Sequence, residues 1–254
     1  MPPRQALSAV LVKRGVAVSL DAAVDLIVAG RVLVNGATAM SGSHQVAPSD
    51  SIHITEQSRF VSRGGDKLQG AIEHFKLDFG GKSVLDVGAS TGGFTDCALR
   101  AGATHVTALD VGHSLLHERL ANDPRVLVVD KCNARSLSDR RSNSPVLDHY
   151  DIVVADLSFI SLTAVTDALC SRVTPNGELV LLIKPQFEAT KSEVDKGAGI
   201  IMDPAVHQRV CDLVIAAYQL RGCVVQGIMP SPIRGAKGNS EFLLYLRMPR
   251  IVIE

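Results

Sequence analysis

The chain has 254 residues, 46% of them hydrophobic and 20% charged, which is enough to bury a core in one large domain or in two smaller ones. Its 26 lysines and arginines balance 26 aspartates and glutamates, so any nucleic-acid binding must depend on local basic patches and not on net charge. We find no apolar run of about 18 residues and no export signal, and the five cysteines form no Cys-x-x-Cys pair. These features argue against a membrane span, secretion, a disulfide framework and a metal site, and they favour a cytoplasmic protein.

Residues 1–55 have the pattern of a small α+β domain. Apolar residues recur at helical spacing in two segments between residues 5 and 30, and Ser19 is a candidate N-cap for the second helix. Alternating apolar residues then lead to Asn35 and Gly36, a pair typical of a two-residue β-turn, and a last short strand follows.

A polar linker at residues 56–63 is predicted to lead into a second domain at residues 64–254. There, apolar strands alternate with helical patterns, which predicts a parallel sheet covered on both faces. The last two strands have no helix between them and must therefore be antiparallel. The predicted strands are 83–87, 105–110, 125–130, 151–156, 178–184, 222–229 and 241–247, with helices near 93–102, 113–121, 161–173 and 204–221. This pattern indicates a Rossmann-like α/β sheet of the methyltransferase type, parallel with an antiparallel terminal strand, rather than a dinucleotide dehydrogenase sheet.

The turn after the first of these strands is the sharpest local feature. The strand contains Asp86, a run of small residues follows, and a helix begins after Gly92 and Gly93. Ligands of open α/β sheets bind beyond the carboxyl ends of the strands, and glycines such as Gly88 let a ligand approach the backbone closely. The turn is neither G-x-G-x-x-G nor a phosphate-binding P-loop. The alternative to a ligand site is an ordinary strand-turn-helix with a glycine-rich bend, which would explain Gly88 alone more readily than the whole series of residues.

Two carboxylates indicate which ligand this turn would take. Asp86 suits an aminoacyl ammonium group better than a pyrophosphate. Asp110 ends the next strand, where its carboxylate can accept hydrogen bonds from the hydroxyls of a ribose. The pattern therefore favours a nucleoside cofactor that carries an amino acid.

Four tracts, LDVGASTGGFT, VADLSFISL, LIKPQFE and GNSEFLLYLR, resemble the TlyA family of FtsJ-like ribose 2′-O-methyltransferases that act on ribosomal RNA. The tract RGVAVSLDAAVDLIVAGRVLVNG also resembles the S4-like RNA-binding module at the amino terminus of that family. The resemblance implies a class I methyltransferase fold and S-adenosylmethionine as cofactor. No metal is expected, because the chemistry needs none and no His/Cys ligand spacing is present. The resemblance also implies ribosomal RNA within ribosomal subunits as partner, with a large-subunit cytidine as target and a small-subunit cytidine as a second target in some members.

The family's catalytic set is Lys-Asp-Lys-Glu, which the motifs carry onto Lys67, Asp156, Lys184 and Glu241. Asp156 and Lys184 each end an apolar strand, so both are expected at the ligand-binding edge of the sheet. Lys184 could take or stabilise the proton that a ribose hydroxyl loses, with Asp156 orienting it. Alternatives remain for the other positions: Lys67 as a solvated lysine, Asp156 as a helix cap and Glu241 as an edge-strand charge.

The cofactor set combines the turn with the resemblance, which implies that Gly92 and Phe94 line the site. Asn133 is expected near the adenine edge, or else as a cap of the following turn. The predicted cofactor residues are Asp86, Gly88, Ser90, Gly92, Gly93, Phe94, Asp110 and Asn133. His113 and His117 mimic metal spacing on a predicted helix, but they have no third ligand and are expected at the surface.

A modest basic stripe is expected to follow the RNA backbone. Its members are Arg4, Lys13, Arg14, Arg31, Arg59 and Arg63, and Lys191, Lys196, Arg234 and Lys237 could add contacts near the active edge. Two other functions stay open: an RNA-binding assembly factor without catalysis, and a lytic protein, since the family also carries a haemolysin label.

Overall fold

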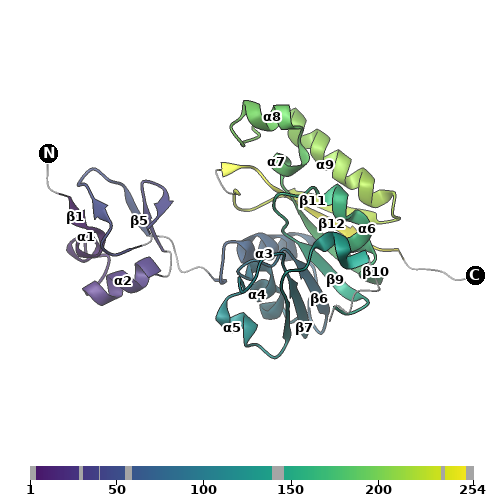
Figure 1. The fold of residues 1–254 in the computed structure, drawn as a ribbon, viewed down its shortest axis with the longest axis horizontal. Helices are drawn as coiled ribbons and strands as arrows, with labels where there is room; N and C mark the ends of the chain where they lie inside the picture. Colours follow the sequence, from purple (N-terminus) through teal and green to yellow (C-terminus); the bar gives the residue numbers. More distant parts are fainter. Residues whose placement is uncertain are drawn as a thin grey trace, which may run out of the picture. The chain divides into compact units, whose positions relative to one another are not determined.

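The chain divides into two compact units, residues 1–59 and 60–254 (Figure 1). The structure is a computed structural model that describes residues 4–28, 31–39, 41–54, 59–138, 146–235 and 238–249. The division falls inside the stretch that the sequence predicts as a linker. Phe60 lies in that stretch too, but its side chain is buried in the core of the second unit.

The first unit is a small α+β fold. Apolar side chains from both helices, including Leu7, Leu11 and Ile27, pack against Val32 of the central strand. Its helices are α1 (Leu7–Lys13) and α2 (Leu20–Val28), and its strands are β1 (Gln5–Ala6), β2 (Val32–Val34), β3 (Ala37–Thr38), β4 (Gln45–Val46) and β5 (Ile52–Ile54). The strands form a sheet of order β3-β2-β5 and a separate antiparallel pair, β1 with β4.

Local signals in the first unit are confirmed. The Ser19 hydroxyl accepts a hydrogen bond from the Ala22 amide at 3.1 Å, as an N-cap does. Asn35 and Gly36 both have positive φ, 51° and 84°, which is the geometry of the turn predicted between β2 and β3. The β1–β4 pair was not predicted, because two-residue strands are too short to show an alternating pattern.

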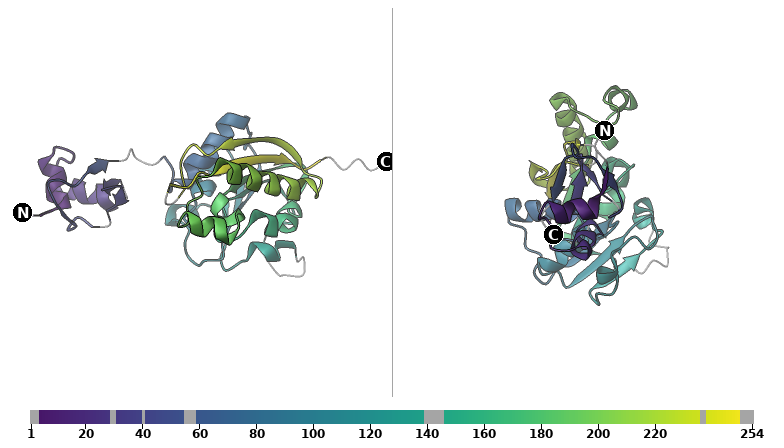
Figure 2. Two further views of the ribbon diagram at one scale, coloured as in Figure 1. Left: turned by 90° about the horizontal axis from the view of Figure 1, so that it is seen from above. Right: turned by 90° about the vertical axis from the view of Figure 1, so that its left-hand side faces the viewer.

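The second unit is a seven-stranded sheet with helices on both faces (Figure 2). The strand order is β11-β12-β10-β9-β6-β7-β8. The five strands from β10 to β8 are parallel, and β12 is antiparallel to both of its neighbours, as predicted. The strands are β6 (Ser83–Val87), β7 (His105–Leu109), β8 (Val126–Val129), β9 (Tyr150–Ala155), β10 (Val173–Ile183), β11 (Val224–Pro230) and β12 (Phe242–Arg247).

Alternate residues of each central strand point into two separate cores. Val84 of β6 faces the core that includes α3 and α4, whereas Leu85 faces the core that includes α6 and α9. The helices of this unit are α3 (Gly64–Phe75), α4 (Gly93–Arg100), α5 (Glu118–Ala121), α6 (Thr166–Cys170), α7 (Pro185–Glu188), α8 (Lys191–Lys196) and α9 (Pro204–Gln219), with 3₁₀ turns η1 (Ala134–Ser138) and η2 (Leu162–Val165). Both faces of the sheet are therefore buried, which explains the continuous apolar strands.

Two predicted helices are wrong in extent. The helix expected at 113–121 is only α5, because Asp130 binds the Ser114 amide and the His113 ring and holds the preceding residues in a loop. His113 and His117 are consequently not on one helical face, and both are exposed, as expected. The helix expected at 161–173 is η2 followed by α6, and it ends early because Val173 already pairs with β9.

Candidate active site

Two lysines and two carboxylates form a chain of ion pairs at the carboxyl edge of the parallel strands. The Lys184 Nζ lies 2.6 Å from Asp156 Oδ1, Lys67 Nζ lies 3.7 Å from Asp156 Oδ2, and Lys67 Nζ lies 2.7 Å from Glu241 Oε2. Their side chains are 10% exposed for each lysine, 20% for Asp156 and 2% for Glu241. The structure thus brings together all four residues of the predicted catalytic set.

Strand register explains why these four residues meet. Strands β9 and β10 are parallel neighbours, so Asp156 and Lys184, which follow them directly, emerge at the same edge. The antiparallel pairing of Phe242 with Ile183 places Glu241 opposite Lys184. Lys67 reaches the edge from the first turn of α3. Three buried charges and the half-buried Asp156 pair with one another and so avoid the large cost of an unpaired buried ion.

The Glu241 carboxylate is also fixed by the backbone next to it. A Cβ atom on Gly235 would overlap Glu241 Oε1, so a larger residue there would displace the carboxylate from its present position. The side chain of Asn239 is buried, accepts a hydrogen bond from the Ile201 amide at 3.0 Å and donates one to the Gly199 carbonyl at 2.9 Å. Asn239 therefore anchors the segment from which Glu241 enters the site.

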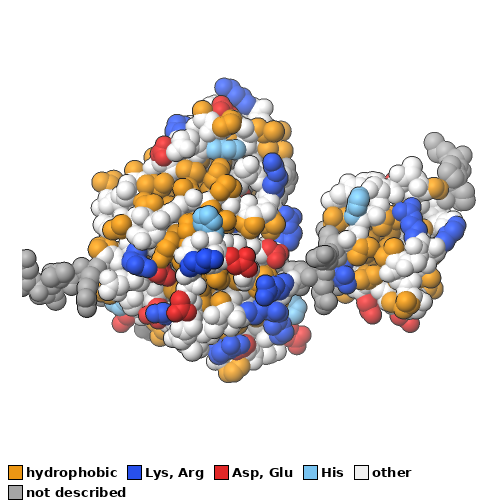
Figure 3. All heavy atoms as spheres, turned by 180° about the vertical axis from the view of Figure 1, so that it is seen from behind, with side chains coloured by type: hydrophobic (Ala, Val, Ile, Leu, Met, Phe, Trp, Pro, Cys, Tyr) orange, Lys and Arg blue, Asp and Glu red, His pale blue; other side chains and the backbone are white. Residues whose placement is uncertain are grey.

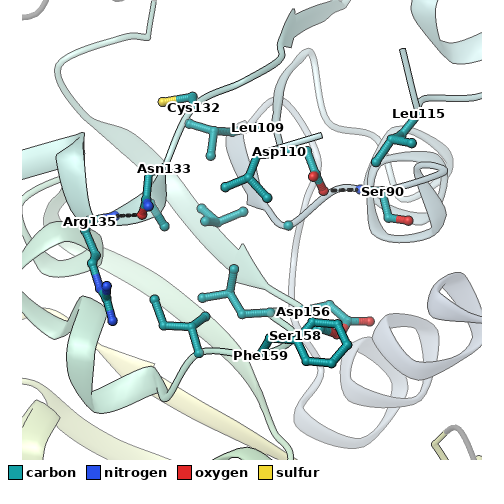
Figure 4. Close-up of a pocket in the computed structure, with 16 residues that line it drawn as sticks. Ser90, Leu109, Asp110, Leu115, Cys132, Asn133, Arg135, Asp156, Ser158 and Phe159 are labelled. Atoms are coloured by element: carbon teal, nitrogen blue, oxygen red, sulfur yellow. Dashed lines mark hydrogen bonds between the residues drawn. The ribbon is translucent and has the colours of Figure 1, made fainter. Parts of the chain in front are cut away.

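A cavity of about 460 Å³ opens beside the ion pairs (Figure 4). It shares Asp156 and Ser158 with the network, because the Ser158 hydroxyl accepts a hydrogen bond from Lys184 Nζ at 2.8 Å. The wall is mostly apolar, with a few polar groups, as small-molecule sites are. It is lined by Val87, Gly88, Ser90, Leu109, Asp110, Val111, Leu115, Cys132, Asn133, Ala134, Arg135, Asp156, Leu157, Ser158, Phe159 and Ile160.

Four of the eight predicted cofactor residues line this cavity: Gly88, Ser90, Asp110 and Asn133. Asp110 accepts hydrogen bonds from the Ser90 and Gly112 amides, each at 2.8 Å, and so connects the two loops that form one wall. Gly88 has a φ of 84°, and a Cβ there would lie 2.8 Å from the Asp156 carbonyl oxygen. The Asn133 side chain accepts from the Arg135 amide at 3.0 Å, which is the capping role weighed above.

The other predicted cofactor residues are absent from the cavity wall. Gly92 and Gly93 allow close packing, since a Cβ on Gly92 would overlap Leu120 and one on Gly93 would overlap Ser62. Phe94 belongs to α4, and its side chain is buried in the core that α3 and α4 share. The tight turn of this motif thus serves helix packing as well as the cavity.

Asp86 is the fourth of these residues, and it is fully buried. Its Oδ2 accepts a hydrogen bond from the Thr95 hydroxyl at 2.6 Å, whereas Oδ1 has no hydrogen-bond partner. Burial raises the pKa of Asp86 to about 7, and the hydrogen bond from Thr95 opposes this increase. A buried carboxyl group with one unpartnered oxygen would be stabilised in its charged form by a cationic partner.

Sequence reasoning missed several cavity residues. Phe159 is 91% exposed, has a φ of 64° and places its ring 5.2 Å from that of Phe187. Ser158, Cys132 and Arg135 also line the cavity without having been predicted. Exposed aromatic and small polar residues have no distinctive spacing, so the only signal was their place directly after a strand end.

The predicted RNA-binding residues lie in both units. In the first, Lys13 and Arg14 line a shallow concavity of about 260 Å³ together with Gln5 and Pro48. Arg4 donates to the Gln45 carbonyl at 3.4 Å, Arg31 is half-buried and Arg59 is exposed.

In the second unit, Arg63 donates to the Arg234 carbonyl at 2.6 Å, and Lys191 and Lys196 lie on α8, whereas Lys237 lies outside the described residues. Figure 3 shows basic side chains interspersed with acidic ones on the displayed face of this unit.

Comparison with known proteins gives the family. The FtsJ-like methyltransferase family matches residues 60–248. The chain belongs to the FtsJ-like methyltransferase family. A second family, the S4 domain, matches residues 7–52 of this methyltransferase. No helix in the described part of the chain is long and apolar enough to cross a membrane, and no cluster of three potential metal ligands occurs there.

Relatives of this FtsJ-like methyltransferase cover almost its whole length. The 16S/23S rRNA (cytidine-2′-O)-methyltransferase TlyA of Mycobacterium tuberculosis is 41% identical, over 97% of this chain and 91% of the relative. Hemolysin A of Brachyspira hyodysenteriae is 39% identical, over 89% and 93%. A solved structure from Streptococcus thermophilus that carries a provisional hemolysin name has a TM-score of 0.73 and 33% identity, over 98% and 91%.

Proposed function

We propose that this methyltransferase transfers the methyl group of S-adenosylmethionine to the ribose 2′-hydroxyl of a cytidine in ribosomal RNA. The observation that carries the proposal is the shared wall: Asp156 belongs both to the cavity and to the ion pair with Lys184. The S4 domain match and the name of the mycobacterial relative support an RNA substrate.

The cavity fits S-adenosylmethionine chemically. Asp110 would bind the ribose hydroxyls, the apolar side chains Leu109 and Leu115 would contact the adenine, and Asn133 would contact its edge. The unpartnered Oδ1 of Asp86 is a buried acceptor for the aminoacyl ammonium. When bound, the cofactor supplies a methyl group that is already strongly electrophilic, so the protein needs to position and deprotonate the hydroxyl.

Lys184 is the residue proposed to act on that hydroxyl. Asp156 and Ser158 hold its amine from two sides, at 2.6 and 2.8 Å, at the rim of the cavity. From there the group can stabilise the developing alkoxide as an ammonium, or receive the hydroxyl proton as a neutral amine after passing its own proton to Asp156. Lys67 and Glu241 fix the far side of Asp156. The exposed ring of Phe159 at the same rim offers a surface on which a nucleobase can stack.

Substitution of Lys184 by alanine tests this proposal. We expect Lys184→Ala to lower the rate of methyl transfer by about 10²–10⁴-fold, as loss of a general acid–base group does, while the affinities for cofactor and RNA stay near wild type. Mapping of 2′-O-methylation in ribosomal RNA incubated with each protein measures both the rate and the target. Lys82→Ala is the control. Lys82 directly precedes β6, so it lies at the opposite edge of the sheet from the ion pairs.

The alternatives predict different results. A non-catalytic assembly factor binds ribosomal subunits but gives no methylation with the wild type. A lytic protein gives leakage from liposomes that is independent of Lys184. Either result contradicts the proposal.

A further inference from the structure

One half-buried carboxylate next to the site is not used by the mechanism above. Glu188 ends α7, the short helix that begins directly after Lys184. Its Oε2 accepts a hydrogen bond from the Ser161 hydroxyl at 2.5 Å, and its Oε1 accepts one from the Leu162 amide at 2.7 Å. Burial raises the pKa of Glu188, and these two hydrogen bonds oppose that increase. Both acceptor atoms are thus engaged by a single segment far away in sequence.

The segment held by Glu188 is the end of the 157–161 loop, which forms part of the cavity wall. Leu157, Ser158, Phe159 and Ile160 all line the cavity. At its start the loop is fixed to the sheet, because the Asp156 amide donates to the Val87 carbonyl at 3.1 Å. At its far end Glu188 holds it. The loop is therefore tied at both ends, and α7 provides the second tie.

The conformation of this loop requires such support. Phe159 has a φ of 64°, which is unfavourable for a bulky side chain and persists only where the surroundings impose it. Its ring contacts Phe187, the neighbour of Glu188 on α7. The Tyr218 hydroxyl of α9 donates a hydrogen bond to the Leu162 carbonyl at 3.3 Å, so Leu162 is held by Tyr218 as well as by Glu188.

We infer that Glu188 is a positioning residue: its carboxylate fastens the 157–161 loop to α7 and so keeps Ser158 and Phe159 in place beside the Lys184 amine. This inference rests on the proposed function for its effect on catalysis, but not for its effect on the loop. Glu188 touches neither the network nor the cavity, and it acts through Ser161 and Leu162.

Hydrogen exchange measures the tie directly on the full chain without any ligand. For Glu188→Ala we expect amide exchange in the peptide spanning residues 157–162 to become about tenfold faster, because the Leu162 amide loses its acceptor. Glu188→Gln keeps an oxygen for that amide and an amino group for the Ser161 hydroxyl, so exchange stays near wild type. Glu193→Ala is the control: it removes a carboxylate that binds Thr190 and Arg209 but not the loop.

Cofactor binding and turnover measure the consequence for the site. Glu188→Ala is expected to weaken S-adenosylmethionine binding by about tenfold and to lower kcat, with recovery of both in Glu188→Gln. Ser161→Ala removes one of the two hydrogen bonds, so its effects on exchange, binding and kcat should lie between those of the wild type and of complete loss of the tie. This variant carries the test if Glu188→Ala fails to fold.

Two outcomes overturn the inference. One is wild-type exchange of residues 157–162 in folded Glu188→Ala, and the other is a Glu188→Gln protein as defective as Glu188→Ala, which would assign the effect to charge. If the wild type binds no S-adenosylmethionine, the proposed function fails, whereas the exchange experiment still decides the role of Glu188.

Discussion

Single residues at this site differ in how firmly their surroundings fix them. The carboxylates of Asp156 and Glu241 are held by lysines, and that of Asp110 by two backbone amides. Asp86 accepts a hydrogen bond from the Thr95 hydroxyl, and its other oxygen is buried without a hydrogen-bond partner. Asp86 is therefore the residue whose behaviour should depend most on pH and on a ligand.

The pKa of Asp86 gives a stability prediction with a definite sign. A carboxyl whose pKa is raised to about 7 keeps its proton in the folded protein but loses it in the unfolded chain above its ordinary value of 3.8. The free energy of unfolding should therefore fall as pH rises from about 4 to about 7. At about 1.4 kcal/mol per pKa unit, the loss between about pH 5 and pH 8 reaches up to about 3 kcal/mol.

Asp86→Asn removes this dependence, because an amide does not ionise in that range. Urea unfolding of both proteins at several pH values measures the difference, which should grow in favour of the variant as pH rises. Parallel curves for the two proteins would contradict the pKa assignment. Added cofactor should reduce the loss in the wild type, since an ammonium near Asp86 favours its charged form.

At the scale of elements, the contact between the first turns of α3 and α4 connects the two halves of the site. A Cβ on Gly93 would overlap Ser62 and lie 2.8 Å from the Gly65 amide nitrogen. Helix α3 carries Lys67, and α4 begins directly after the turn that lines the cavity. The close approach therefore fixes the lysine relative to the proposed cofactor site.

Gly93→Ala tests this packing. The added methyl group meets backbone atoms that cannot rotate away, so we expect a loss of about 1–3 kcal/mol in the free energy of unfolding, as overpacked sites show. Methyl transfer should fall more than stability alone explains, because Lys67 moves with α3. Gly80→Ala is a suitable comparison, since its Cβ would meet only the side chain of Asp78. Equal stability of the two variants would show that the helices can separate without cost.

Elements with strong local patterns were predictable and those set by distant contacts were not. The apolar strands from β6 to β10 and the antiparallel β11–β12 pair follow from composition and spacing. The loop before α5 was predicted as helix because its conformation depends on Asp130, which lies beyond the next strand.

The same distinction applies to the site. Asp156 and Lys184 could be placed together because both end parallel strands, and the resemblance added Lys67 and Glu241. The tie from Glu188 to Ser161 joins residues 27 apart in sequence and leaves no local pattern.

At the scale of the whole molecule, two units with separate cores divide the work in the proposed function. The S4 domain match covers the first unit, and the ion-pair network and cavity belong entirely to the second. Because the net charge is zero, the proposed affinity for RNA would have to come from patches, and we propose the one around Lys13 and Arg14.

The double substitution Lys13→Ala and Arg14→Ala tests this division. RNA affinity should fall, and the slope of log affinity against log salt should become shallower by about 0.7 for each phosphate that the variant no longer neutralises. Titration of the RNA at several salt concentrations gives the slope, and calorimetry should show unchanged cofactor affinity. An unchanged salt slope would place the RNA-binding surface elsewhere on the protein.

The position of β12 has a consequence for how the enzyme is made. Although β12 is the last strand of the sheet in chain order, it lies between β10 and β11. During synthesis both of those strands lack their β12 partner until residues 242–247 have left the exit tunnel of the ribosome. Glu241 leaves the tunnel together with these residues. The ion-pair network therefore cannot close in a nascent chain that stops short of this strand, so the proposed activity is withheld until translation has passed it.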